Sequence, residues 1–181
     1  MTEPLIPELD FDPARHGHAV VSGESTTDAI VAIKRWAEGQ DGDFVVLAPW
    51  ASGPPRPHWT QVSQDLAWAK HLGTVRAEID ARLLRFTAPA LRAEPARPLF
   101  VIVDEAALLH SYVNDPSVRA ETSTGAETHP DAVEVVSDIA RMGRAVRVHL
   151  IVVTSASPVV RLTVLRSCAQ QFDLLSSGAR A

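Results

Sequence analysis

Two acidic residues, Asp104 and Glu105, stand directly after an apolar run, and this order suggests a site for a divalent cation. The run from Leu99 to Val103 is rich in β-branched and aromatic residues, which predicts a buried strand. At the end of such a strand, an aspartate can hold Mg²⁺ through water while the following glutamate polarises an attacking water. An acidic pair also commonly ends a buried strand where it meets solvent, so a purely structural role stays open.

A second predicted strand, residues 16–22, runs into a turn that partly matches a phosphate-binding loop. The pattern of such a loop is G-x-x-x-x-G-K-[ST], in which backbone N–H groups and the lysine bind the phosphates. Gly23 fits the first position, but Asp28, Ala29 and Ile30 stand where the second glycine, the lysine and the hydroxyl residue belong. Losing the lysine removes a contact worth about 1.5–3 kcal/mol, which lowers affinity by roughly one to two orders of magnitude.

The same turn also matches an ordinary helix start, with Ser25 as the N-cap and an aspartate three residues later. The residues whose backbone could still bind an anion are Gly23, Glu24, Ser25, Thr26 and Thr27. Two interpretations follow, a plain helix cap and a weakened nucleotide site.

Three further residues are candidates for the same chemistry. Thr154 ends the predicted strand 148–154, where it could sense a γ-phosphate or simply cap the strand. His149 lies inside this strand and is expected to pack in the core. Arg144 belongs to a short basic run that could face DNA or a neighbouring subunit's nucleotide, although such a run is more often a solvated helix end favoured by the helix dipole.

Helical and strand patterns alternate along the chain, which predicts an α/β fold with parallel strands. The expected elements after the first strand are a helix over 27–38, a strand over 43–48, a loop over 49–58, a helix over 61–86, the strand 99–103, a short helix opening at 106–112, a polar loop over 114–130, a helix over 131–143, the strand 148–154, a helix or turn over 159–169 and an edge strand near 172–175. Residues 1–14 are expected to form a flexible acidic leader, and residues 15–181 a single domain.

Composition narrows the class of protein. The 181 residues are 46% hydrophobic, which is enough for the packed core of one domain. The net charge of −5 gives the surface as a whole no attraction for nucleic acid, so DNA contact would depend on local basic loops. A single cysteine fits a reducing cytoplasm. No run approaches the ~20 apolar residues of a membrane helix, so no direct membrane insertion is expected.

Taken together, these segments resemble the motor domain of the FtsK/SpoIIIE family of DNA translocases, which includes conjugative-transfer and type VII secretion ATPases. The segments that match, in order, are residues 18–23, 66–83, 99–109 and 139–154. The last, IARMGRAVRVHLIVVT, matches best and carries Arg144, His149 and Thr154 onto family positions.

The resemblance implies a P-loop NTPase-like (RecA/ASCE-type) fold, a three-layer sandwich with a mainly parallel central sheet. It also implies ATP and Mg²⁺ as ligands. In this scheme Asp104 holds the metal through water, Glu105 and Thr154 complete the catalytic set, and Arg144 acts on a neighbouring subunit. The departures from the family pattern, above all the missing lysine, fall in the nucleotide site. ATP is therefore expected to bind weakly or not at all, and hydrolysis is doubtful.

The expected function is a non-catalytic or weakly ATP-binding component of a machine for DNA translocation, conjugative transfer or secretion, in the cytoplasm. Self-association, or ring assembly with an FtsK-like homologue, is the expected partnership, and DNA is a further candidate partner. Two alternatives stay open: an active ATP-dependent DNA translocase with an unusual phosphate loop, and a pure protein-interaction module on the same scaffold.

Overall fold

A parallel sheet forms the centre of the molecule. The computed structural model describes residues 8–23, 25–51, 56–63, 68–88, 96–108, 132–155 and 169–174. Within these ranges the strands are β1 (Ala19–Gly23), β2 (Asp43–Leu47), β3 (Trp59–Val62), β4 (Leu99–Asp104), β5 (Val148–Ser155) and β6 (Gln170–Asp173). They form one sheet in the order β3-β2-β4-β5-β1-β6, and every neighbouring pair is parallel.

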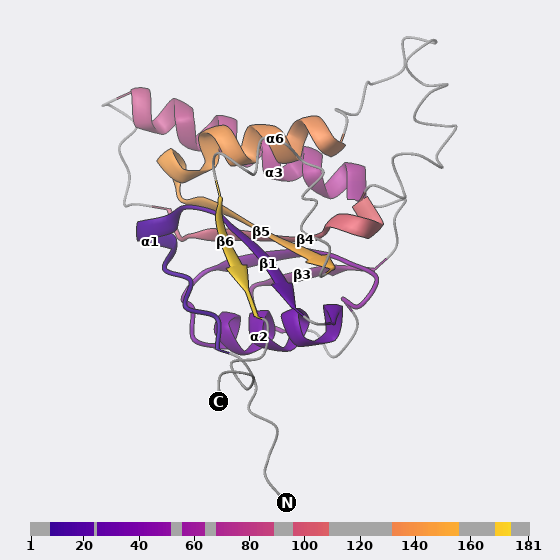
Figure 1. Cartoon of the computed structure of the whole chain (residues 1–181). Helices are drawn as coiled ribbons and strands as arrows, with labels where there is room; N and C mark the ends of the chain where they lie inside the picture. Colours follow the sequence, from indigo (N-terminus) through magenta and orange to yellow (C-terminus); the bar gives the residue numbers. More distant parts are fainter. Residues whose placement is uncertain are drawn as a thin grey trace, which may run out of the picture.

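Helices cover both faces of this sheet. Helix α2 (Thr26–Glu38) lies on one face, and α3 (Trp68–Thr87) and α6 (Ala132–Met142) lie on the other, as Figure 1 shows. A short helix α1 (Pro13–His16) precedes β1, and a 3₁₀ turn η3 (Gly143–Val146) leads from α6 into β5. The arrangement confirms the predicted α/β, P-loop NTPase-like three-layer sandwich with a parallel central sheet.

The spacing of apolar residues explains why the layers pack in this way. In α2, the buried residues Ala29, Ala32, Ile33 and Ala37 recur every three or four positions, so they form one stripe against the sheet. All six residues of β4 are buried, as expected for a central strand covered on both faces. Two apolar clusters, one on each face, therefore hold the sheet between its helices.

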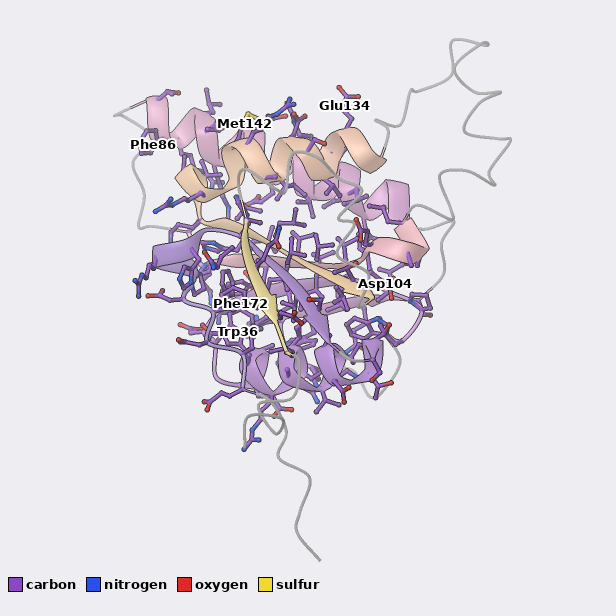
Figure 2. All side chains as sticks on the ribbon, viewed as in Figure 1. Trp36, Phe86, Asp104, Glu134, Met142 and Phe172 are labelled. Atoms are coloured by element: carbon purple, nitrogen blue, oxygen red, sulfur yellow. The ribbon has the colours of Figure 1, made fainter. Side chains whose placement is uncertain are left out.

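One strand was not anticipated. The sequence patterns predict a helix over 61–86, but Trp59–Val62 pairs with β2 as the edge strand β3, and the described part of the helix covers Trp68–Thr87. Four residues after a proline-rich stretch are too few to show strand alternation, so the pairing with β2 decided the structure. The apolar stripe of α3 also ends early: Phe86 is 68% exposed and lies at the opposite end of the molecule from Asp104 (Figure 2).

Part of the predicted leader packs on the domain instead. Leu9 and Phe11 are each only 4% exposed and belong to the cluster around α2. The indole nitrogen of Trp36 donates a hydrogen bond to the Phe11 carbonyl at 2.8 Å, and Asp12 caps α1. Residues 8–14 are therefore held by the same core as the sheet. Gly17, with φ of 79°, separates α1 from β1, so the strand begins three residues later than predicted.

Several predictions lie outside the described residues: the loop over 114–130, nearly all of the element over 159–169, and the end of the helix predicted at 106–112. Residues 105–108 are helical, as that last prediction requires. Among the described helices, none combines the length and the apolar character needed to cross a membrane.

Candidate functional site

The strand order brings the predicted site residues to one edge of the sheet. Strand β5 lies between β1 and β4, although it follows both in sequence. Its register places Thr154 beside Ser22 of β1, and Val153 beside Asp104 of β4. Because parallel strands end at the same edge, Gly23, Asp104 and Thr154 meet at the carboxyl edge, where ligands bind in open α/β sheets.

Glu105 and Thr154 contact each other directly. The Thr154 hydroxyl donates a hydrogen bond to Glu105 Oε2 at 2.7 Å, and the residues are only 6% and 4% exposed. Hydrogen bonds to a carboxylate are stronger than those between neutral groups, so this contact fixes both side chains. The sequence analysis paired these two residues by role, and the structure places them in contact. The carboxylate that would polarise an attacking water is thus held by a hydroxyl group.

Asp104 is engaged at both carboxylate oxygens. Oδ1 accepts the backbone N–H of Ala107 at 3.1 Å, an ordinary helix cap for residues 105–108. Oδ2 accepts the indole N–H of Trp50, also at 3.1 Å. The Trp50 ring in turn lies under the Lys34 ammonium, which is 5.5 Å from the ring centroid. The aspartate is 9% exposed, so an aromatic ring and a helix end occupy the place where a metal's water would approach.

Trp50 is the site residue that the sequence analysis missed. It follows β2 by three residues, and β2 ends beside β4 because Leu47 is in register with Val103. A residue just after β2 must therefore lie close to the residue that ends β4. The strand order, which the sequence patterns did not supply, was needed to draw that conclusion.

The turn after β1 is closed upon itself. Ser25 Oγ accepts the backbone N–H of Asp28 at 3.2 Å, and Asp28 Oδ2 accepts the backbone N–H of Ser25, also at 3.2 Å. The serine hydroxyl also donates to Asp28 Oδ2 at 2.8 Å. These bonds form a complete capping box, and they occupy donors that an anion would use. Glu24 lies outside the described residues.

The helix begins too early for a phosphate loop. Thr26 and Thr27 already form the first turn of α2, and Ala29, at the position of the lysine, is 0% exposed in the core beneath the sheet. A Cβ on Gly23 would stand 3.0 Å from the Ser25 carbonyl oxygen and 3.3 Å from the Ala29 nitrogen, so the turn is tight. A lysine introduced at position 29 would be buried, and the exchange would test packing rather than nucleotide binding.

Arg144 and His149 lie at the other edge of the sheet. Arg144 belongs to η3, just before β5, and its guanidinium donates to the Arg15 carbonyl oxygen at 3.4 Å. His149 is 5% exposed, and Gly17 O accepts a hydrogen bond from its Nδ1 at 2.8 Å. The prediction of a packing role for His149 is therefore confirmed. Because Arg144 precedes β5 and Thr154 lies near the end of that strand, Arg144 lies away from the carboxyl edge of its own chain.

His18, the residue just before β1, lies at the same edge. Its Nδ1 accepts the Leu150 backbone N–H at 3.0 Å, so Nε2 carries the proton of the neutral ring. The pKa of His18 is lowered to about 4, mainly by burial and also by the nearby His149 and Arg144, while the Ala140 carbonyl opposes the shift. Burial also lowers the pKa of His149, helped by Arg147. Both imidazoles are thus neutral links between β1 and β5.

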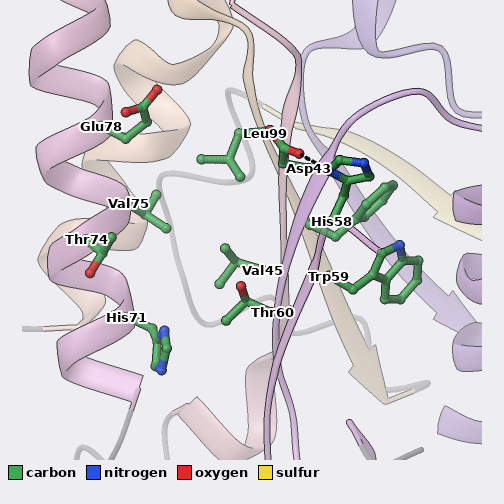
Figure 3. A pocket seen from close by; sticks show the side chains of 11 residues that line it. Asp43, Val45, His58, Trp59, Thr60, His71, Thr74, Val75, Glu78 and Leu99 are labelled. Carbon is green, nitrogen blue, oxygen red and sulfur yellow. Dashed lines mark ion pairs between the residues drawn. The ribbon is translucent and has the colours of Figure 1, made fainter. Parts of the chain in front are cut away.

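Two pockets in the described part of the chain lie apart from Asp104, Glu105 and Thr154. One, of about 450 Å³, lies between α3 and the strands β2 and β3, with His71, Thr74 and Glu78 on the helix side and Val45 and Thr60 on the strand side (Figure 3). The other, of about 350 Å³, lies at the amino edge beside Arg144 and His149. Among the described residues, no three His, Cys, Asp or Glu side chains are grouped to hold a metal ion.

The carboxyl edge therefore does not fit Mg²⁺ as it stands. The two oxygens of Asp104 accept N–H donors, which a cation would have to displace. The other carboxylate, Glu105, is held by a hydroxyl. The geometry defines a P-loop NTPase-like domain in which the polar side chains at the carboxyl edge bond to groups of the same domain.

Comparisons with known proteins agree on this fold. No protein-family model matches the sequence. Among the curated proteins, none matches it. Among solved structures, the chain is similar to EssC (ATPases 2 and 3) from Geobacillus thermodenitrificans, with a TM-score of 0.66 and 14% identity over 97% of this chain and 34% of that chain. It is also similar to Thermomonospora curvata EccC (ATPases 2 and 3) in complex with a signal sequence peptide, with a TM-score of 0.58 and 13% identity over 90% and 30%.

A third similar structure is the pCW3 conjugation coupling protein TcpA, in a monomer form with ATPγS, with a TM-score of 0.54 and 15% identity over 80% of this chain and 44% of that chain. The resemblance to FtsK/SpoIIIE-type P-loop ATPase domains is thereby confirmed at the level of the fold. The chain spans between 30% and 44% of the length of these three proteins.

Proposed function

We propose that this chain is an FtsK/SpoIIIE-like domain that does not catalyse ATP hydrolysis and serves as a component of a secretion, conjugation or DNA-translocation machine. The observation that carries the proposal is the closed carboxyl edge. Asp104 is bonded to Trp50, Glu105 to Thr154, and Ser25 to Asp28, so the polar groups of the former nucleotide site satisfy one another.

The kind of machine is inferred from the structural neighbours. EssC and EccC are represented by ATPases 2 and 3, and TcpA is a conjugation coupling protein. A single domain of this fold would act beside others, either copies of itself or an FtsK-like homologue that hydrolyses ATP. Arg144 would then be the residue offered to a neighbour's site, because it lies away from the carboxyl edge of its own chain.

An active ATP-dependent translocase is the second candidate, because the catalytic set is present in part. Asp104 would hold Mg²⁺ through water, Glu105 would act as the base, and Thr154 would sense the γ-phosphate; the 2.7 Å contact between the last two favours their acting together. This function requires the Trp50 indole to leave Asp104 when nucleotide binds. A pure interaction module on the same scaffold is the third candidate.

Nucleotide binding separates the first two candidates. Purified protein is titrated with a fluorescent ATP analogue with and without Mg²⁺, alongside Asp104→Ala and the matched surface variant Asp80→Ala. We expect no saturable signal up to millimolar nucleotide in any of the three proteins. Magnesium-dependent binding that Asp104→Ala abolishes and Asp80→Ala retains would instead establish a working site and overturn the non-catalytic proposal.

Association with other ATPase domains separates the first candidate from the third. Sedimentation of the chain alone, and mixed with an active FtsK-like ATPase domain, is expected to show a complex in at least one case. Arg144→Gln is expected to lower the ATP hydrolysis rate of the mixture while leaving the complex intact. A chain that stays monomeric under both conditions would favour the pure interaction module with an unrelated partner.

A further inference from the structure

The amino edge of the sheet carries a pocket, and Arg144, which the proposed function offers to a neighbouring subunit, is one of its lining residues. Its volume is about 350 Å³, within the size range of small-molecule sites. It lies between the start of α1, the turn before β2, and the beginnings of β4 and β5. Pro13, Ala14 and Pro98 contribute apolar surface to it, and Arg144 and Arg147 contribute the basic groups.

Neither arginine forms an ion pair with any described residue. Arg144 donates to the Arg15 carbonyl at 3.4 Å, and Arg147 donates to the Ala96 carbonyl at 3.1 Å. Each guanidinium has five N–H donors in a planar fork that matches a carboxylate. The contacts to neutral carbonyls fix where the two guanidiniums lie but leave their charges without a described counter-ion.

The two carboxylates beside the same pocket are engaged elsewhere. Asp12 Oδ1 accepts the Ala14 backbone N–H at 2.9 Å, as the cap of α1. Asp41 is 90% exposed at its side chain and pairs with Arg97. Neither forms an ion pair with the pocket's arginines, so the field inside the pocket favours an anion.

The floor of the pocket favours an anion with a carbon body. Pro13, Ala14 and Pro98 supply its apolar surface, whereas Phe100 is only 1% exposed and is stacked on His149, with 5.3 Å between the ring centroids. An inorganic ion would gain nothing from the apolar surface, whereas an aliphatic carboxylate would bury its methylene groups against it.

We propose that this pocket binds a carboxylate carried on a short aliphatic chain. Its oxygens would lie on the guanidiniums of Arg144 and Arg147, and its methylene groups on Pro13 and Pro98. A free organic diacid and a glutamate side chain of a partner protein share this chemistry. The proposal does not depend on the state of the nucleotide edge, because the pocket lies at the opposite edge of the sheet.

The test is an NMR titration of the full chain that follows the ring protons of His149. The probes are glutarate, a short glutamate-containing peptide, and inorganic phosphate. We expect glutarate or the peptide to shift the His149 signals saturably, and both Arg144→Gln and Arg147→Gln to weaken binding about tenfold. Arg141→Gln, which changes an arginine of α6 outside the pocket, is expected to leave binding unchanged.

The outcomes distinguish the sources of the carboxylate. Arginine-dependent binding of glutarate supports a free acid as ligand, and binding of the peptide alone supports a partner's side chain. Phosphate binding as tight as that of glutarate, equal loss in Arg141→Gln, or no His149 shift with any probe at millimolar concentration would each overturn the proposal.

Discussion

The two edges of the sheet differ in how their polar side chains are satisfied. At the carboxyl edge, the side chains of Asp104, Glu105 and Ser25 bond to groups of the same domain. At the amino edge, Arg144 and Arg147 contact only backbone carbonyls among their described partners, beside a pocket. The comparison teaches that the two edges of one sheet can differ in their polar contacts while sharing a core, because apolar stripes hold the layers together and strand-end residues change independently of them.

The largest expected effect belongs to the amino edge and concerns His18. In the unfolded chain the His18 ring takes up a proton near pH 6.5. In the folded protein its pKa is lowered to about 4, mainly by burial. The unfolded state therefore binds more protons in this window, and the free energy of unfolding falls as the pH falls, by on the order of 3 kcal/mol. Urea denaturation at several pH values measures the slope.

The variant His18→Asn keeps an acceptor for the Leu150 N–H without a titrating ring, so it should flatten that slope. His71→Gln, on the surface of α3, is the matched control and should leave the slope unchanged. An unaltered slope in His18→Asn would mean that the buried histidine does not set the acid sensitivity of the amino edge.

The next effect belongs to the carboxyl edge. Thr154→Val removes the hydroxyl that donates to the buried Glu105 carboxylate, and it should lower the free energy of unfolding by about 2 kcal/mol. Thr60→Val, on the exposed edge strand, removes the same hydroxyl group where it should cost less than about 0.5 kcal/mol. Equal costs in urea denaturation would show that the Glu105–Thr154 contact does not stabilise the closed edge.

Trp50→Phe should cost about 1.5 kcal/mol, because it removes the indole donor from Asp104 but keeps a ring under Lys34. Trp59→Phe is the control, because Trp59 begins β3 at the amino edge of the sheet, away from Asp104, and the new ring still stacks on Phe44. Repeating the ATP-analogue titration on both variants sharpens the comparison. Magnesium-dependent binding gained only by Trp50→Phe would identify the indole as the sole obstacle to nucleotide.

The smallest effect is expected at the helix start. Ser25→Ala removes the N-cap of α2 and should cost about 1 kcal/mol, whereas Ser63→Ala, at an exposed position outside the strands, should stay within about 0.5 kcal/mol. Millimolar phosphate should not raise the melting temperature of the wild-type protein. Stabilisation by phosphate that Ser25→Ala removes would reveal an anion site and would weaken the contrast between the two edges.

The sequence predicted the elements whose patterns are long. The helix over 27–38 and the strands at 43–48, 99–103 and 148–154 agree with the structure to within one residue at each end. Short or unpatterned pieces were missed: β3 has four residues, and residues 8–14 hold their place through two apolar side chains, Leu9 and Phe11. In such pieces pairing and packing outweigh local pattern, so no window of sequence could reveal them.

Some features of the candidate site could likewise be predicted from the sequence, and others could not. The sequence alone determined that the lysine position of the phosphate loop holds an alanine and that an acidic pair ends a buried strand, because these are facts of residue order. Only the tertiary structure decided that Trp50 covers Asp104, that Thr154 holds Glu105, and that Arg144 lies at the opposite edge from both. The physical reason is that strand order and register place residues some 50 positions apart within hydrogen-bonding distance, and neither is encoded in local periodicity.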